Sequence, residues 1–357
     1  MAATAKSSAI LRRALLYVPA SSPRMLTKSL GLTSDNVTYD LEDSVTPAAK
    51  PGARTALREH LAGLSLSRPP PGVSELAVRI NAVSTPHALD DLTALKAVLP
   101  HLDAIVVPKV NSASDLTFVA DVLQHLAPER QQQQQQRGSS TTNTTTNNKP
   151  PIKLIALIES ARAVMNLREI CTALPPPPPA SSSPDPDTST AQNPLSGLIF
   201  AAEDFALDLS LTRTPSLTEF LYARSAIATA ARAFGVPSAI DLVCTSYAGE
   251  AGRARLEEEC RGGRSLGFGG KQCIHPSQVE TVQRLFGPGE VEVEWAVRVV
   301  VADGKAAARE GRGAFALDGS MIDAPVVGKA RATVERARRC GFDVEALMMR
   351  WKDQEPE

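Results

Sequence analysis

The stretch LIALIE, residues 154–159, decides the fold, because it is an almost uninterrupted apolar run that ends on a carboxylate. Runs of this kind are typical of strands buried on both faces, as they are in parallel sheets. Stretches with helical spacing, such as residues 85–99 and 220–234, separate most of the runs. Seven further runs share the pattern: ALLYVP (14–19), VTYDLE (37–42), LAVRIN (76–81), AIVVPK (104–109), LIFAAE (198–203), AIDLV (239–243) and KQCIH (271–275).

Eight buried strands that alternate with helices predict an α/β fold, the (β/α)8 TIM barrel, whose closed sheet has no edge. An open, doubly wound sheet is the alternative, but no GxGxxG motif follows the first run. We expect an N-terminal tail or short targeting segment at 1–13, the barrel at 14–290, and a C-terminal helical lid extension at 291–357. Low-complexity insertions at 130–150 and 175–195 interrupt the barrel, and we expect disorder there because they contain too few apolar residues to bury.

The composition favours a soluble protein of a reducing compartment. A net charge of −1 favours neither nucleic acid nor an anionic membrane as partner, and the apolar runs are too short to span a bilayer. The five cysteines show no CxxC spacing, so neither a disulfide framework nor a zinc site is expected. The N-terminal residues are basic and contain no acid before Asp35, which fits either an organelle transit peptide or a frayed tail.

Polar or ionisable residues stand at the end of almost every run. Active sites of TIM barrels are built at this carboxyl-terminal face of the strands. Charged residues also cap buried strands in general, but that explanation does not account for so many ends at once. The residues concerned are Tyr17, Asp40, Glu42, Asp43, Arg79, Asn81, Lys109, Glu159, Glu203, Asp204, Asp241 and His275.

Glu159 and Asp204 are the candidate metal ligands, because they follow neighbouring strands of the predicted barrel. Two converging carboxylates repel each other unless a cation or a proton compensates. Oxygen ligands with open positions suit Mg²⁺, which takes one or two carboxylates together with water and substrate. A histidine-rich metal site is not indicated, since only His275 falls at a strand end. The alternative is that both are surface acids at loop starts.

Two further candidate sites consist of basic side chains. Arg79 lies in an otherwise apolar run and needs partners, which the acids of YDLEDS (39–44) could supply; its guanidinium also matches a carboxylate or an enolate-like oxygen. Arg24 and Lys28 fall on one face of a helix that Ser21 or Ser22 would cap, so they could hold a phosphate or be a solvated basic face.

The loop LGFGGKQ (266–272) lacks the GK[ST] ending and precedes a strand, so we reject it as a nucleotide site.

Together these motifs resemble the HpcH/HpaI aldolase–citrate lyase β-subunit (CitE-like) family. The matching stretches are RRALLYVPASSPRML, YDLEDSVTPAAK, AVRIN, VVPKVNSASDL, LIALIESARAVMNLREI, AAEDFALDL, GKQCIHPSQVETVQ and GSMIDAPVV, in this order. Within the family, GAFALDGSMIDAP and FLYARSAIATAARAFG favour the branch that acts on citramalyl-CoA. Departures are Ala20, where relatives commonly have Gly, and LVCTSYAGEAG (242–252), which replaces a more acidic stretch.

The resemblance implies a magnesium-dependent lyase on a modified TIM barrel, usually a homotrimer, in the mitochondrion or the cytoplasm, with the mitochondrion favoured. Its expected reaction is cleavage of a 3-hydroxyacyl-CoA, citramalyl-CoA giving pyruvate and acetyl-CoA. Alternatives are a malyl-CoA or citryl-CoA lyase, a malate-synthase-like condensation, a pyruvate aldolase without CoA, or a degenerate CoA-thioester-binding subunit.

The resemblance also implies roles for single residues. Glu159 and Asp204 would hold Mg²⁺, and Arg79 would contact the acyl portion of the substrate as a catalytic group. The CoA side would be lined by Tyr17, Arg24 and Lys28 and by the backbone at Ile274 and His275.

In this family the C-terminal segment covers a barrel mouth, and Asp323 would be its catalytic acid–base group. The apolar residues around Asp323 could hold its carboxylate in a drier site. The alternative is that Asp323 only caps the helix that follows it.

Overall fold

The computed structural model describes residues 11–64, 72–128, 150–174, 194–310 and 314–356 of the chain. The chain divides into two compact units, Met1–Val282 and Gln283–Glu357. The first unit contains the strands of the barrel, and the second begins inside the helix α11 (Val279–Phe286). Most of the two predicted insertions and of the N-terminal tail lies outside the described residues.

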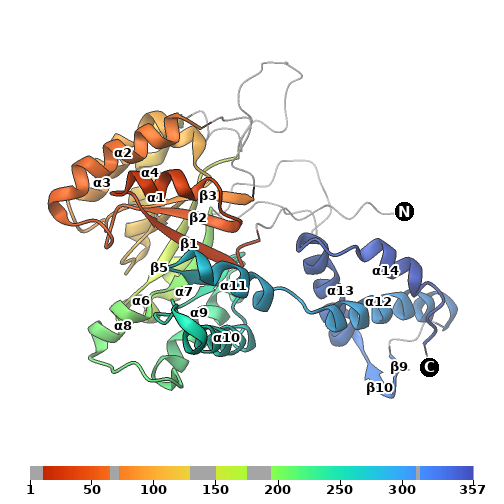
Figure 1. Ribbon diagram of the computed structural model, residues 1–357. Coiled ribbons are helices and arrows are strands. Elements are labelled where there is room, and N and C mark those ends of the chain that lie inside the picture. The colour runs from red at the N-terminus through yellow and green to blue at the C-terminus, as the bar shows by residue number, and fades with distance from the viewer. Residues whose placement is uncertain (1–10, 65–71, 129–149, 175–193, 311–313, 357) are drawn as a thin grey trace. The chain divides into compact units, whose positions relative to one another are not determined.

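The first unit is a closed barrel of eight parallel strands (Figure 1). The strands pair in sequence order, and β8 closes the barrel on β1 through the pair Ala14 and Lys271. This confirms the (β/α)8 prediction and excludes the open sheet. The strands are β1 (Ala14–Pro19), β2 (Ser34–Asp40), β3 (Val73–Arg79), β4 (Ala104–Val107), β5 (Lys153–Ile158), β6 (Leu195–Phe200), β7 (Ala239–Asp241) and β8 (Gly270–Cys273).

Helices follow the strands, as the alternating pattern predicts. The α-helices of this unit are α1 (Pro23–Ser29), α2 (Lys50–Ala62), α3 (His87–Ala94), α4 (Ala113–Leu126), α6 (Ala161–Met165), α7 (Leu167–Cys171), α8 (Ala202–Leu209), α9 (Leu221–Ala233) and α10 (Gly249–Ser265). Short 3-10 helices are η1 (Pro47–Ala49), η2 (Lys96–His101), η5 (Thr218–Phe220) and η6 (Pro276–Gln278). No helix among the described residues is long and apolar enough to cross a membrane.

An apolar cluster formed by one face of six strands fills the barrel. Its members are Leu15, Ala77, Ala104, Val106, Ile155, Leu157, Ile199 and Ile240, all buried. Tyr17 and Ala201 pack against this cluster at its margin. Interior layers of this kind make a TIM barrel a packed core rather than a pore, so chemistry is confined to its mouth.

Several strands begin earlier than the apolar runs predict, because buried polar residues are among the first residues of these strands. Arg12 donates to both carboxylate oxygens of Glu75 in β3, at 2.7 and 2.6 Å, and to the carbonyl oxygen of Ser196 in β6 at 2.6 Å. These paired groups are buried without being left unsatisfied. Gly270 allows the close approach that seals the barrel, since a Cβ there would lie 1.9 Å from the Arg12 carbonyl oxygen.

The second unit is helical, with one small hairpin. It contains α12 (Glu290–Glu310), β9 (Phe315–Leu317), β10 (Ser320–Ile322), α13 (Ala324–Arg339) and α14 (Val344–Arg350). Leu317 and Ile322 of the hairpin are buried in a core shared with α12, α13 and α14. Asp318 and Gly319 turn the chain with φ angles of 49° and 70°, the left-handed pair of a type I′ hairpin turn.

All five cysteines are free thiols, and four of them, Cys171, Cys244, Cys260 and Cys273, are buried. Burial raises the pKa of the Cys171 thiol to about 12. A buried thiol with a raised pKa is unreactive, so these side chains act as small apolar groups in the core.

Candidate active site

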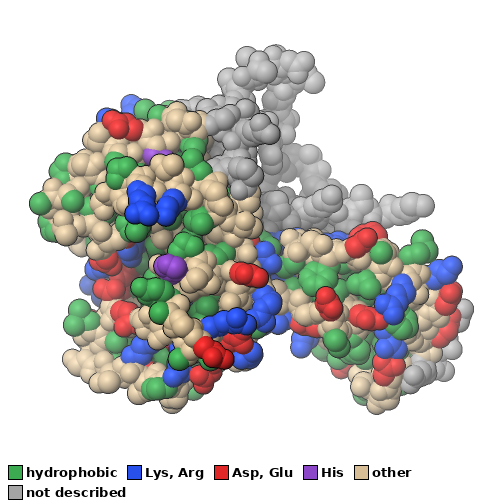
Figure 2. All heavy atoms as spheres, in the orientation of Figure 1, with side chains coloured by type: hydrophobic (Ala, Val, Ile, Leu, Met, Phe, Trp, Pro, Cys, Tyr) green, Lys and Arg blue, Asp and Glu red, His purple; other side chains and the backbone are tan. Residues whose placement is uncertain are grey.

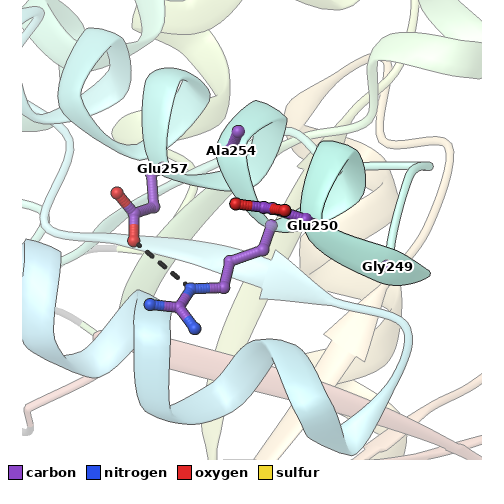
Figure 3. A pocket seen from close by; sticks show the side chains of 5 residues that line it. Gly249, Glu250, Ala254 and Glu257 are labelled. Carbon is purple, nitrogen blue, oxygen red and sulfur yellow. Dashed lines mark ion pairs between the residues drawn. The ribbon is translucent and has the colours of Figure 1, made fainter.

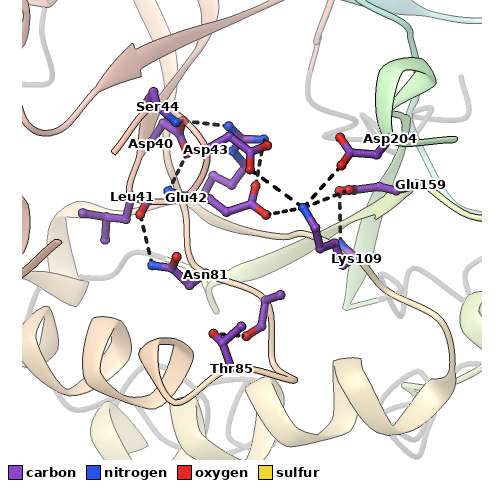
Figure 4. A network of polar contacts seen from close by, with 12 residues as sticks. Asp40, Leu41, Glu42, Asp43, Ser44, Asn81, Thr85, Lys109, Glu159 and Asp204 are labelled. Carbon is purple, nitrogen blue, oxygen red and sulfur yellow. Dashed lines mark hydrogen bonds and ion pairs between the residues drawn. The ribbon is translucent and has the colours of Figure 1, made fainter. Parts of the chain in front are cut away.

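Glu159 and Asp204 converge at the carboxyl-terminal edge of the barrel (Figure 4). Glu159 directly follows β5, and Asp204 lies in the first turn of α8, which follows β6. Because β5 and β6 are paired in parallel, their ends bring both carboxylates to one place. Glu159 Oε2 lies 3.5 Å and Asp204 Oδ1 lies 3.6 Å from the same atom, the Nζ of Lys109. Two acids that are 45 residues apart in the chain therefore face one cation.

Lys109 lies at the centre of this network, although its sequence context predicts no specific role for it. It lies two residues beyond β4, with a left-handed backbone at φ 51°. Its backbone N–H donates to Glu159 Oε1 at 3.1 Å, and its ammonium donates to Glu42 Oε1 at 2.7 Å. Asp43 Oδ1 is 3.9 Å from the same ammonium. The only signal in the sequence was a lysine at a strand end.

Arg79, at the end of β3, is paired with the acids of YDLEDS, as its place in an apolar strand predicted. Its Nε and Nη2 each donate to one oxygen of Asp40 at 2.7 Å. Its Nη1 lies 3.0 Å from Glu42 Oε2 and 3.4 Å from Asp43 Oδ2. The Arg79 guanidinium also lies over the ring of Tyr17, 4.7 Å from the ring centre. Bidentate pairing and stacking together fix the orientation of the guanidinium.

Burial and the neighbouring cations set the protonation of these groups. Burial alone would raise the pKa of Asp40, but Arg79, together with hydrogen bonds from Ser44 and Glu42, holds that pKa below its ordinary value. Glu42 is the opposite case: burial raises its pKa to about 7, although Arg79 and Lys109 oppose the shift. The pKa of Glu159 is raised as well, mainly by burial, with Lys109 acting against it. The site thus combines an ionised, paired Asp40 with a Glu42 that titrates near neutral pH.

Tyr17 lies deeper in the mouth than the other residues predicted for the CoA side. Its hydroxyl donates to Gln272 Oε1 at 3.1 Å, and burial raises its pKa above the ordinary tyrosine value. The tyrosine is therefore neutral, and its ring supports the Arg79 guanidinium that stacks on it.

The helix α1 begins as predicted: the hydroxyl of Ser22 accepts from the Met25 N–H, and Pro23 is the first helical residue. Arg24 and Lys28 are both exposed on it. Lys and Arg side chains gather over this helix in the space-filling view (Figure 2). An exposed basic face fits either of the two interpretations that the sequence left open, a phosphate site or a solvated surface.

Ile274 and His275 follow β8, and their backbone N–H groups are already bonded. Both donate to Gln278 Oε1, at 2.9 and 3.3 Å. The His275 ring caps η6 by accepting from the Ser277 N–H at 3.2 Å, and it stacks on Tyr247 with ring centres 4.8 Å apart. A ligand at this strand end would meet the exposed side chains and carbonyl groups rather than these N–H groups. Tyr247 was not among the predicted site residues.

Asp323 belongs to the second unit and caps α13. Its Oδ1 accepts from the Val326 N–H at 3.1 Å, so Asp323 does cap this helix. Its acid–base role stays a prediction. The apolar residues around it form the hairpin, in which Leu317 and Ile322 are buried while Met321 is 74% exposed. These residues anchor the segment that carries Asp323.

An open depression lies on α10, lined by Gly249, Glu250, Arg253, Ala254 and Glu257 (Figure 3). Arg253 and Glu257 form an ion pair there, 3.7 Å apart, one helical turn from each other. All of its lining residues come from one helix, and none belongs to the carboxylate network at the barrel mouth.

Comparison with known proteins agrees with the barrel fold. Residues 13–276 match the family model of the HpcH/HpaI aldolase/citrate lyase. The chain belongs to this family. It is 32% identical over 335 residues to the human protein "Citramalyl-CoA lyase, mitochondrial", which covers 92% of this chain and 86% of that protein.

Other members of the family are similarly close. The chain is 35% identical over 324 residues to the "Citrate lyase subunit beta-like protein" of Deinococcus radiodurans, covering 90% of this chain and 95% of that protein. The solved structure of CitE from Mycobacterium tuberculosis in complex with magnesium, acetoacetate and coenzyme A has a TM-score of 0.64 and 30% identity, and the match covers 93% of this chain and 99% of that one. As a member of the HpcH/HpaI family, the chain is a lyase.

The residues at the mouth of this family member fit a magnesium ion. The described residues contain no cluster of three or more His, Cys, Asp and Glu side chains placed to hold a metal. A site here would therefore consist of Glu159 and Asp204, with the remaining positions left to water and substrate, as Mg²⁺ prefers. Their convergence on the Lys109 ammonium shows that the two carboxylates already face a single cation.

Proposed function

We propose that the chain is a magnesium-dependent lyase that cleaves the carbon–carbon bond of a 3-hydroxyacyl-CoA thioester. Its preferred substrate would be citramalyl-CoA, which gives pyruvate and acetyl-CoA. The observation that carries the proposal is the convergence of Glu159 and Asp204 on one cation, beside the fixed guanidinium of Arg79. The named activity of the human relative supports the choice of substrate.

Glu159 and Asp204 would hold Mg²⁺ by their carboxylates. When bound, the ion would supply Lewis-acid polarisation of the oxygens at the α-hydroxy acid end of the substrate. Magnesium in the CitE structures supports this assignment.

The protein's own groups would handle the charge and the protons of the reaction. A positioned base would take the substrate hydroxyl proton, and cleavage of the C–C bond would leave its electron pair on the acetyl-CoA fragment as an enolate. Arg79, held in place by Asp40, would stabilise the developing oxyanion without having to reorganise. Asp323 would then donate a proton to the enolate carbon, completing acetyl-CoA. In the condensation direction the same carboxylate would remove that proton.

The CoA portion would be bound by the basic face of α1. Arg24 and Lys28 are exposed on this helix, where their charges can meet phosphate groups. Tyr17 and the strand end at Ile274 and His275 would line the path from that face to the mouth. We also propose that the active assembly is a homotrimer. We propose the mitochondrion as its location, because the names of the mammalian relatives include that organelle.

A coupled assay for acetyl-CoA, the product that cleavage of all three candidate thioesters would share, tests the reaction, the metal and the substrate together. Citramalyl-CoA, malyl-CoA and citryl-CoA are supplied in parallel, first with Mg²⁺ and then with EDTA. We expect acetyl-CoA release that is fastest from citramalyl-CoA, with pyruvate as the second product, and that stops in EDTA. A preference for malyl-CoA or citryl-CoA would make that thioester, rather than citramalyl-CoA, the substrate of this lyase. No cleavage of any thioester by the folded protein would instead support the CoA-thioester-binding subunit.

A further inference from the structure

The ammonium of Lys109 stands where the two candidate metal ligands meet. Its Nζ is 3.5 Å from Glu159 Oε2 and 3.6 Å from Asp204 Oδ1, and it donates a 2.7 Å hydrogen bond to Glu42 Oε1. Asp43 Oδ1 completes the set at 3.9 Å. One positive charge therefore faces four carboxylates that come from the ends of β2, β5 and β6 (Figure 4).

The backbone at Lys109 is shaped to keep this arrangement. A φ of 51° is the left-handed region, which a residue with a Cβ adopts only when its surroundings compensate. Here the same turn directs the Lys109 N–H to Glu159 Oε1 at 3.1 Å, while the ammonium faces Glu159 Oε2. Asn111 Nδ2 donates to the Lys109 carbonyl oxygen at 3.1 Å and holds the turn from the other side. Lys109 thus contacts both oxygens of Glu159.

The contacts of the ammonium are unequal, which separates them into two sets. The close, aligned hydrogen bond goes to Glu42, whereas Glu159 and Asp204 lie beyond ordinary hydrogen-bond length. An ammonium that left Glu159 and Asp204 would keep the shortest of its contacts, the 2.7 Å hydrogen bond to Glu42 Oε1. A divalent ion and the ammonium would repel each other if both faced the same carboxylate oxygens.

We propose that Lys109 is a positioning residue. Its ammonium pairs with Glu159 and Asp204 when no divalent cation lies between them, and it releases both carboxylates when the cation binds. Without metal, the ammonium keeps the two carboxylates together against their mutual repulsion. When the metal binds, the ammonium releases this pair and stays on Glu42. This inference rests on the proposed metal site, and it adds that the chain itself lowers the affinity of that site for the ion.

Titration with Mn²⁺, followed by electron paramagnetic resonance of the free ion, tests this without substrate or turnover. In Lys109→Met the competing charge is gone, so we expect Mn²⁺ to bind about tenfold more tightly than in the wild type. Lys109→Arg keeps the charge and should remain near the wild-type affinity. Lys96→Met is the matched control, because Lys96 is exposed in η2, before β4, and its loss changes the net charge equally.

Each result has a distinct meaning. Mn²⁺ affinity in Lys109→Met that is equal to or weaker than in Lys96→Met would overturn the proposal. If Lys109→Met does not fold, Lys109→Gln removes the same charge with a polar side chain, and the same increase is expected. If the wild type binds Mn²⁺ but the variants do not bind it more tightly, only this inference fails. If the wild type binds no Mn²⁺ at all, the proposed metal site fails with it.

Discussion

At the scale of single residues, the pairing of Arg79 could be predicted while the position of Lys109 could not. An arginine inside an apolar strand requires buried partners, and the acids of YDLEDS are the ones that the neighbouring strand supplies. The structure confirms Asp40 as the bidentate partner. Lys109 ends a strand just as any capping lysine does. Its role depends on a left-handed backbone and on carboxylates from three other strand ends, which no local pattern encodes.

Glu42 predicts a pH dependence of stability. Its pKa is raised to about 7 in the folded protein from an ordinary value of 4.5. Between these values the folded state binds more protons than the unfolded state, so the free energy of unfolding falls as pH rises from 4.5 to about 7. We expect Glu42→Gln, which mimics the protonated acid, to lack this decrease. Urea unfolding of the two proteins across that pH range, in EDTA, measures the difference.

Asp43→Asn is the control for Glu42→Gln, because Asp43 contacts the same two cations but its side chain is 55% exposed. Its pH profile should parallel that of the wild type. A wild-type profile that stays parallel to that of Glu42→Gln would show that Glu42 does not titrate in this window.

At the scale of helices and strands, all eight predicted strands exist, but several begin up to three residues earlier than their apolar runs. Polar residues such as Asn36 and Glu75 lie in these early strand positions, where Glu75 accepts hydrogen bonds from both Asn36 and Arg12. Hydrophobicity alone cannot find such positions. The hairpin β9–β10 was missed although Asp318–Gly319 between apolar residues is a strong hairpin signal. The interpretation of this stretch from its sequence rests on Asp323 and does not use the Asp318–Gly319 turn.

Asp323 allows a helix cap to be separated from catalysis, because Asn caps a helix about as well as Asp does. We expect Asp323→Asn to keep the wild-type melting temperature and Mg²⁺ affinity, while kcat falls by about 100-fold or more. Asp323→Ala should lose the same activity and, in addition, about 1 kcal/mol of stability through the missing cap. Thermal unfolding and steady-state kinetics on citramalyl-CoA give both quantities. Full activity in Asp323→Asn would remove Asp323 from the mechanism and leave it as a cap.

At the scale of the whole molecule, closure of the barrel is what brings the site together. Glu42, Lys109, Glu159 and Asp204 come from four separate strand ends, and they meet because all strands are parallel and the sheet is closed. The match to the HpcH/HpaI family model covers residues 13–276, which is the barrel and its mouth. Asp323 lies beyond that match, in the second unit.

The most direct test of the metal-dependent lyase is the Mg²⁺ dependence of pyruvate release from citramalyl-CoA by the wild type, Asp204→Asn and Asp208→Asn. Asp208 lies one turn further along α8 and accepts from the Ala161 N–H, so its replacement is the matched control on the same helix. We predict activity that EDTA abolishes in the wild type, a loss of more than about 100-fold in Asp204→Asn, and little change in Asp208→Asn. Equal activity and equal Mg²⁺ dependence in the two variants would contradict the assignment of Asp204, and activity that persists in EDTA would contradict the metal itself.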